Sequence, residues 1–306
     1  MEKKTLNIRG VMAFCLGALL ISGVGLAQAM TFNECVSAVQ AGLEPGLCYD
    51  VFQIHAVRVA GFDIHGGPAT DPSHAYWAGS PVTTVYLPWR IRMDVNTPPP
   101  QIENSFMNLA KPDMKSRVLQ VQAIHDGVSI VYKIFFKDAT QDDSIADVPL
   151  FHDALAIGMQ YDWRTDALYN PCFAANDQPD MMHMGFPYPG DPVHAFCPVQ
   201  LMFWRADAME IENILANGPG TTIESYETDT GILNTFQSWG NGIWTVLLAR
   251  PMIDPFPPYD SIFPGPNMVT LATGSYDIIF ANWNGSIQER NGYKYIAPWG
   301  TLIIEP

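Results

Sequence analysis

After residue 49, hydrophobic and polar positions alternate with a period of two, in runs rich in Val, Ile, Phe, Tyr and Trp. Successive side chains of a strand point to opposite faces, so this alternation is typical of strands with one buried face. One short helix-like pattern precedes them, at residues 32–42. Strands are therefore predicted at residues 49–61, 81–93, 117–125, 128–137, 153–161, 199–207, 242–252, 275–285 and 293–304.

Turn residues separate these runs. Asp126-Gly127 lies between two alternating runs and predicts a hairpin, and Asn291-Gly292 predicts another whose second strand ends at Trp299. Such dipeptides accept the positive φ angles that tight hairpin turns require. Many short strands with turns between them favour a mainly β fold, and we expect a single β-sandwich.

Long loops connect some of the predicted strands. The chain has 25 prolines and 24 glycines, and these concentrate between the strands, most densely in residues 96–101, 171–192 and 252–267. Loops of this length are uncommon in a compact domain unless they line a site. Neither a repeat nor a linker divides the sequence, so we expect one domain over residues 30–306.

The N-terminal region has the pattern of a secretory signal. Basic residues precede an apolar run at 11–27, and an A-x-A cleavage pattern ends at Ala29. This order predicts a signal peptide over residues 1–29 that lacks the twin arginine of folded-protein export. No later apolar run has the length of a membrane span. An exported, periplasmic protein is expected.

The net charge narrows the choice of partners. The formal charge is −15, and cleavage after Ala29 would remove three basic residues and one acidic residue. The exported form would carry about −17, which argues against nucleic acid and anionic membrane as partners. Such a surface suits docking to a small basic electron carrier, and solubility alone explains it equally well.

Four cysteines remain after cleavage, namely Cys35, Cys48, Cys172 and Cys197. An even number in an exported chain indicates disulfides, and pairing of neighbours along the chain is the simplest of three connectivities. No C-x-x-C pair is present, which excludes covalent c-type haem, iron–sulfur clusters and most structural zinc sites.

Motifs for catalysis are missing from the sequence. It contains no G-x-S-x-G, no P-loop and no H-E-x-x-H. His65, Asp71 and His74 resemble a metal site, but their spacing fits no standard one. A loop with solvated histidines explains these three residues as well.

One loop gathers possible ligands for iron, because Met181, Met182, His183 and Met184 are consecutive in a Pro/Gly-rich segment. A thioether is a known axial ligand of haem iron, although methionines also fill gaps in cores. Lys294 lies between two tyrosines in an otherwise apolar run. A lysine whose pKa is lowered by burial can donate its neutral amine to a metal, whereas most strand lysines are surface charges.

Four segments carry a family resemblance. They contain a W-A-G block that ends in prolines, an H-D-G hairpin followed by K-D-A-T, an M-G to W-R-A-D block, and W-N-G with E-R-N-G-Y-K near the C-terminus. Together they resemble the haem b γ subunits of type II enzymes of the dimethyl sulfoxide reductase family. That group includes ethylbenzene and dimethylsulfide dehydrogenases, selenate and chlorate reductases and nitrite oxidoreductase. The segments are residues 71–100, 121–143, 184–207 and 280–305.

The resemblance implies a DOMON-like cytochrome β-sandwich with one non-covalent haem b held by methionine and lysine. Lys294 matches the family lysine, and Met184 matches the methionine because glycine follows it. Met182, or Met181, is the fallback for Met184, and His183 is a rival ligand. Arg290 is expected to pair with a haem propionate, or to remain a surface charge beside the preceding glutamate.

The resemblance also implies a non-catalytic electron-transfer subunit of an exported molybdoenzyme complex, nitrite oxidoreductase-like in its long loops. Its partners would be an iron–sulfur β subunit, a molybdopterin α subunit and an external cytochrome c-like carrier. The alternative is a haem-free secreted β-sandwich that binds a carbohydrate or another ligand. Eight tryptophans and 12 tyrosines would serve sugar stacking in that case.

Overall fold

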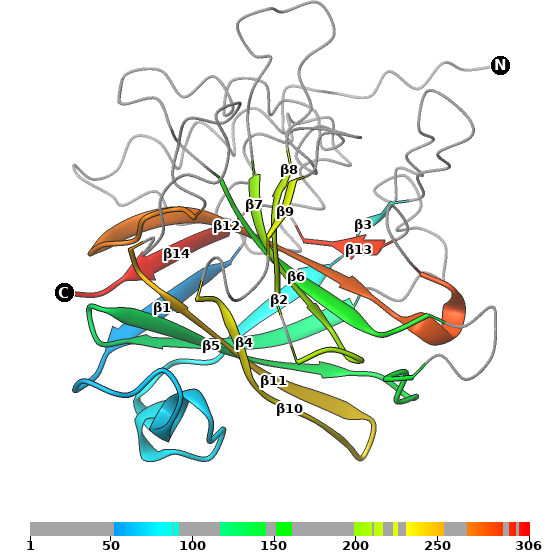
Figure 1. The fold of residues 1–306 in the computed structure, drawn as a ribbon, viewed down its shortest axis with the longest axis horizontal. Helices are drawn as coiled ribbons and strands as arrows, with labels where there is room; N and C mark the ends of the chain where they lie inside the picture. The colour runs from blue at the N-terminus through cyan, green and yellow to red at the C-terminus, as the bar shows by residue number, and fades with distance from the viewer. Residues whose placement is uncertain are drawn as a thin grey trace, which may run out of the picture.

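The computed structural model is built almost entirely of strands (Figure 1). No α-helix occurs in the part of the chain that it describes, which also contains three single-turn 3-10 helices, η2 (Gly67–Ala69), η3 (Ala75–Gly79) and η4 (Gly285–Ile287). The expected mainly β class is confirmed. The described residues are 52–87, 89–91, 117–144, 151–160, 199–209, 211–216, 223–225, 231–253, 268–289, 294–297 and 300–306.

All strands of the described ranges belong to one hydrogen-bonded sheet. Its order is β10-β11-β5-β4-β1-β14-β12-β6-β7-β8-β9, with β2 on β4, and β13 between β12 and β3. Only the pairs of β1 with β4 and with β14 are parallel. The strands are β1 Gln53–Arg58, β2 Thr83–Leu87, β3 Trp89–Ile91, β4 Arg117–His125, β5 Ser129–Lys137, β6 Ala154–Gln160, β7 Val199–Arg205, β8 Glu212–Ala216, β9 Ile223–Ser225, β10 Leu233–Gly240, β11 Ile243–Pro251, β12 Gly274–Trp283, β13 Lys294–Ile296 and β14 Gly300–Ile304.

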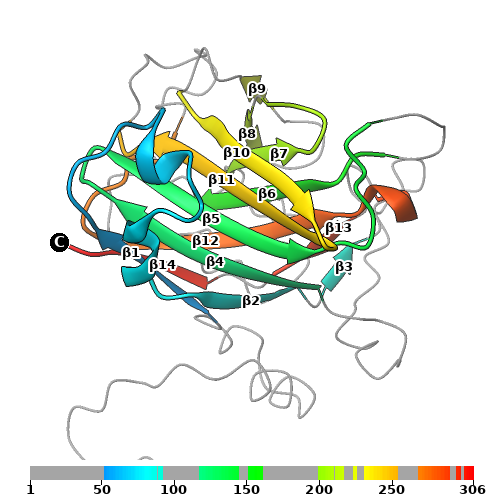
Figure 2. The ribbon, with the colours of Figure 1, turned by 90° about the horizontal axis from the view of Figure 1, so that it is seen from below.

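The sheet curls so that two layers face each other, as the two orthogonal views show (Figures 1 and 2). One layer contains β4, β5 and β11, and the other contains β6, β7 and β12. Aromatic side chains join the layers in the core, where Trp204 of β7 lies 5.3 Å from Trp244 and 6.1 Å from Phe136, measured between ring centroids. The sandwich predicted from the strand pattern is therefore present, built from one continuous sheet.

The layer of β6, β7 and β12 is buried on both faces. Alternate residues of these strands point into the core, and the intervening ones form a second apolar cluster on the outer face. This explains why the sequences of β6 and β12 are almost continuously apolar rather than alternating. The outer-face cluster contains Ala154, Ala156, Val199, Ile279, Ala281, Trp283 and Ile296, packed by Leu201 and Phe203.

Several details of the strand pattern differ from expectation. The run 293–304 was predicted as one strand, but it forms β13 and β14, with Pro298 between them in the sequence. Proline cannot donate to a ladder, which favours an interruption there. A hairpin joins β10 to β11 at Asn241 and Gly242, whose φ angles of 52° and 73° fit a primed turn. β8, β9 and β10 were not predicted.

Candidate functional site

Lys294 is the first residue of β13, and its side chain is buried, with 4% of its surface exposed. In the ladder with β12, Asn282 faces Tyr295 and Ala281 faces Ile296. Because side chains alternate along a strand, Lys294 and Ile296 share the outer face, whereas Tyr295 belongs to the core cluster. The lysine therefore lies at the outer-face cluster, among apolar side chains.

Burial lowers the pKa of the Lys294 amine from 10.5 to about 8. Its Nζ lies 5.2 Å from the ring centroid of Trp283. A tryptophan face attracts an ammonium, whereas desolvation favours the neutral amine, and the lowered pKa means that desolvation prevails. At neutral pH this lysine can give up its proton at a much smaller cost than a lysine in water.

A small pocket lies beside Lys294 in the outer-face cluster. Its lining includes Ala156 and Gly158 of β6, Ala281 of β12 and the larger side chains of Val199, Leu201 and Ile279. A Cβ at Gly158 would lie 2.6 Å from a methyl group of Ile279 and 3.0 Å from one of Leu201, so neighbouring side chains fill the space over this glycine. The cavity at this point measures only about 20 Å³. The described residues therefore place a buried amine among apolar side chains.

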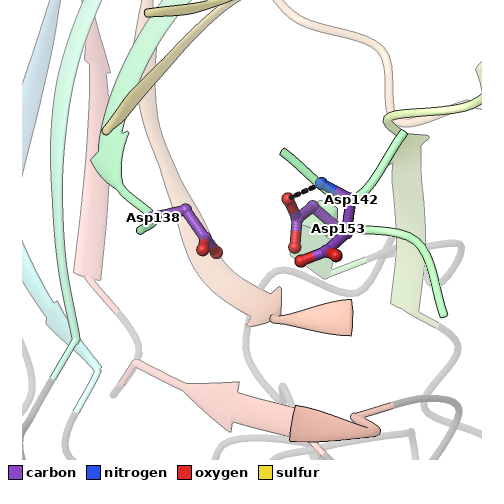
Figure 3. Close-up of side chains that lie close together, drawn as sticks. All are labelled: Asp138, Asp142 and Asp153. Atoms are coloured by element: carbon purple, nitrogen blue, oxygen red, sulfur yellow. Dashed lines mark hydrogen bonds between the residues drawn. The ribbon is translucent and has the colours of Figure 1, made fainter. Parts of the chain in front are cut away.

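Three carboxylates meet at the same end of the sandwich, near the end of β12. Figure 3 shows Asp138, Asp142 and Asp153 with their side chains turned toward one another. One oxygen of each lies within 4.8 Å of the others, a spacing that could hold a metal ion. Asp138 accepts from the Asn284 amide at 2.8 and 2.9 Å. Asp153 accepts from backbone N–H groups of Asp142 and Gly285 at 3.1 and 3.0 Å.

These hydrogen bonds give the carboxylates a structural role. Asp153 also accepts from the Trp244 indole at 2.9 Å, so both of its oxygens serve protein donors. Burial nevertheless raises the pKa of Asp153 to about 7, with the charge of Asp138 adding to the effect. The cluster ties the end of β5 to β6, β11 and the turn after β12.

Most of the predicted ligands lie outside the described residues. This holds for Met181, Met182, His183 and Met184, for Arg290, and for all four cysteines of the expected exported form. Lys294 is placed, and its burial agrees with the expectation that it is not a surface charge. Whether it ligates iron stays a prediction.

His65, Asp71 and His74 do not form a metal cluster within the part of the chain that the structure describes. The His65 side chain belongs to an exposed residue, Asp71 accepts from Ser73, and His74 accepts from the Tyr76 N–H. The solvated-loop interpretation of these residues agrees with the structure.

Sequence reasoning did not single out Trp283, although it belongs to the W-N-G motif of the last segment. Arg117 and Glu289, which form an ion pair at 2.7 Å beside this site, were also missed as a pair. The W-N-G and E-R-N-G motifs were a signal for Trp283 and Glu289. Nothing in the sequence around Arg117 indicates that it contacts these motifs.

None of the helices in the described ranges has the length and apolarity needed to cross a membrane. No protein-family model matches the chain. Similar curated proteins do exist. A protein of Haloferax mediterranei described as a respiratory nitrate reductase haem subunit is 33% identical over 102 residues, and the match covers 33% of each chain. The chain thus spans about a third of the length of that relative.

A second relative is similar over most of its length. The chlorate reductase γ subunit of Ideonella dechloratans is 25% identical over 273 residues, which is 89% of this chain and 91% of the relative. Solved structures are more distant. A protein of Bacteroides uniformis described as carbohydrate-binding gives a TM-score of 0.43 at 11% identity, covering 83% of this chain and 99% of that one. A family 9 carbohydrate-binding module of Caldicellulosiruptor kristjanssonii gives 0.35 at 6% identity, covering 83% and 96%. Scores this low carry no functional argument.

Proposed function

We propose that this chain is a haem-carrying γ subunit of a respiratory reductase complex and transfers electrons without catalysing the substrate reaction. The observation that carries the proposal is the buried Lys294, whose pKa is lowered to about 8 among apolar side chains. Its support from comparison is the similarity to a haem subunit and to a chlorate reductase γ subunit.

The residues present fit a haem on chemical grounds. A lysine donates to iron only as a neutral amine, and burial at Lys294 favours that form. The apolar side chains around Lys294, which include Trp283 and Ile296, would give a macrocycle an apolar environment. Lys294 would be one iron ligand and Met184 the other, with Met182 as the fallback, and Met181 and His183 as further candidates. A bound haem would supply reversible one-electron chemistry.

The chain's own residues would tune this site. Trp283 covers the Lys294 amine on one side and contacts Phe203, with 5.2 Å between ring centroids. These rings and the other apolar side chains around Lys294 keep water from the amine, which lowers its pKa and eases loss of its proton to a metal. Arg290 would pair with a propionate. Attachment would be non-covalent, since no C-x-x-C-H occurs in the sequence.

The finer assignment follows from the family resemblance. The cofactor would be one haem b, and the complex would resemble nitrite oxidoreductase. An iron–sulfur β subunit would bind this chain, a molybdopterin α subunit would act on the substrate, and an external cytochrome c-like carrier would exchange electrons with the haem. Residues 1–29 would direct export to the periplasm, where the domain would span residues 30–306.

The test is the optical and magnetic-resonance spectrum of the exported protein purified with haem. We expect a low-spin haem in the wild type and its loss, or a high-spin species, in Lys294→Ala and Lys294→Arg, because guanidinium stays protonated. Lys133→Met is the matched control. Lys133 is also buried over a tryptophan, 4.7 Å from the Trp77 ring, but in the other layer. An unchanged spectrum in both Lys294 variants would refute the ligand assignment. A wild type that binds no haem would favour the haem-free binding module.

A further inference from the structure

Arg117, the first residue of β4, makes three contacts in the layer opposite its own. Its Nη1 donates to the side-chain and main-chain oxygens of Asn282 at 2.8 and 3.2 Å. Its Nη2 lies 2.7 Å from Oε2 of Glu289, whose side chain is 1% exposed. The guanidinium also lies 4.4 Å from the ring centroid of Tyr295.

These three partners surround the segment that leads to Lys294. Glu289 comes five residues before the lysine, and Tyr295 follows it directly. Asn282 is the ladder partner of Tyr295 on β12. The Arg117 guanidinium therefore contacts one residue before Lys294 and one residue after it. It also contacts Asn282 of β12, the strand with which β13 pairs.

The two ladders of this segment are short. β13 has three residues and shares two residue pairs with β12 and three with β3. Glu289 strengthens the arrangement, because its Oε2 accepts from the Asn284 N–H at 3.0 Å and its own N–H donates to the Asn284 carbonyl at 3.2 Å. Removing one partner of a buried, hydrogen-bonded ion pair strongly destabilises the folded protein, because the other charge stays buried without compensation.

We infer that Arg117 is a positioning residue that fixes the side chain of Lys294 in the outer-face cluster through Glu289, Asn282 and Tyr295. The inference rests on the proposed function only for the purpose of this positioning, which is to let Lys294 ligate the haem iron. The planar fork of a guanidinium can bond Asn282 and Glu289 while it lies over the Tyr295 ring, and an ammonium cannot match that geometry. Arg117→Lys should therefore fail to replace arginine, although it keeps the charge.

The first test needs no haem. Haem-free wild type, Arg117→Met, Arg117→Lys and Arg205→Met are treated with an amine-acylating reagent, and modification is followed by peptide mass spectrometry at Lys294 and at Lys133. Arg205 is the control, since it forms ion pairs with Asp207 and Glu212 at the end of β7. We expect acylation of Lys294 to accelerate at least about tenfold in both Arg117 variants, while Lys133 changes little, because exposure through local fluctuation is residue-specific.

Equal acceleration at both lysines would mean that Arg117 supports the whole domain, and no acceleration would mean that it does not hold Lys294. Either result overturns the inference. Should the Arg117 variants fail to fold, Glu289→Gln, which keeps the shape and removes the charge, is measured in the same way with the same two outcomes.

The second test uses the haem spectrum. We expect the low-spin fraction to fall in Arg117→Met and Arg117→Lys and to remain in Arg205→Met. Loss of stability in an Arg117 variant with an unchanged low-spin fraction would overturn the positioning role. A wild type that binds no haem would refute the proposed function. The acylation experiment would then decide whether Arg117 positions Lys294.

Discussion

Nζ of Lys294 lies over the indole ring of Trp283, 5.2 Å from the ring centroid, at the outer-face cluster. Lys133 forms a similar pair with Trp77 in the other layer, and it donates to the Pro72 carbonyl at 3.1 Å. This hydrogen bond connects the 67–80 segment to β5, with Lys133 as the donor. Lys294 instead lies beside the outer-face cluster, where apolar side chains such as Ile296 and Trp283 surround its amine.

The free energy of unfolding of the haem-free protein should rise between pH 8 and pH 10.5. Lys294 has a pKa of about 8 in the folded protein and 10.5 as a model value, so the unfolded chain binds more protons in this interval. Lys294→Met should remove the rise and stabilise the protein at pH 7, by up to about 3 kcal/mol. Urea titrations at pH 7, 8, 9 and 10 measure both effects. The same rise of the unfolding free energy with pH in the wild type and in Lys294→Met would contradict the prediction.

Asp153 should give the opposite pH dependence. Its pKa is raised from 3.8 to about 7, so the folded protein binds more protons between these values and its stability falls as pH rises through 7. Asp153→Asn should flatten this fall. It should also lower stability by about 1–3 kcal/mol, since an oxygen acceptor is lost at a buried donor. Asp143→Asn, in the same loop, is the control, and thermal unfolding at pH 5 and pH 8 is the measurement.

Gly158→Ala should weaken the site. The new Cβ would meet side-chain carbons of Ile279, Leu201 and Val199 at 2.6, 3.0 and 3.3 Å, so these side chains must move. Overpacking of this kind costs about 1–3 kcal/mol. Haem affinity should fall because the displaced side chains line the pocket beside Lys294. Gly79→Ala has no atom within 4 Å of its Cβ and should leave affinity and stability nearly unchanged. Haem titration and urea unfolding compare the two variants.

Lys133→Met should loosen the 67–80 segment without changing the haem spectrum. The variant loses the hydrogen bond to Pro72 and the contact with Trp77, which together contribute about 1–2 kcal/mol. Hydrogen exchange should accelerate in this segment while β12 and β13 keep their protection. Faster exchange in β13 would show that the two layers are not independent.

The exported protein should begin near Met30 and lack free thiols. The A-x-A pattern at Ala29 and the four remaining cysteines motivate this prediction. Intact mass and alkylation with and without reductant are the measurements. A chain that retains residues 1–29, or four cysteines alkylated without reduction, would count against it.

Strand positions could be read from the sequence because alternation is local, and the unusual setting of Lys294 was visible for the same reason. Arg117 could not be found in this way, since it is 165 residues from Asn282 and only the topology brings β4 and β12 together. Asp153 is similar, because carboxylates are so frequent in this chain that spacing cannot select a pair. Long-range polar contacts depend on which strands pair and in which register. Hydrophobic periodicity along the sequence does not identify the partner strand, so it cannot predict these contacts.

The shortness of β13 bears on how the Lys294 amine can reach solvent. A strand of three residues, with two ladder pairs to β12 and three to β3, can open at a smaller free energy than the one that unfolds both layers. Opening of β13 alone would expose this amine while the core cluster stays closed, so its access to solvent would follow a local free energy and not the global one.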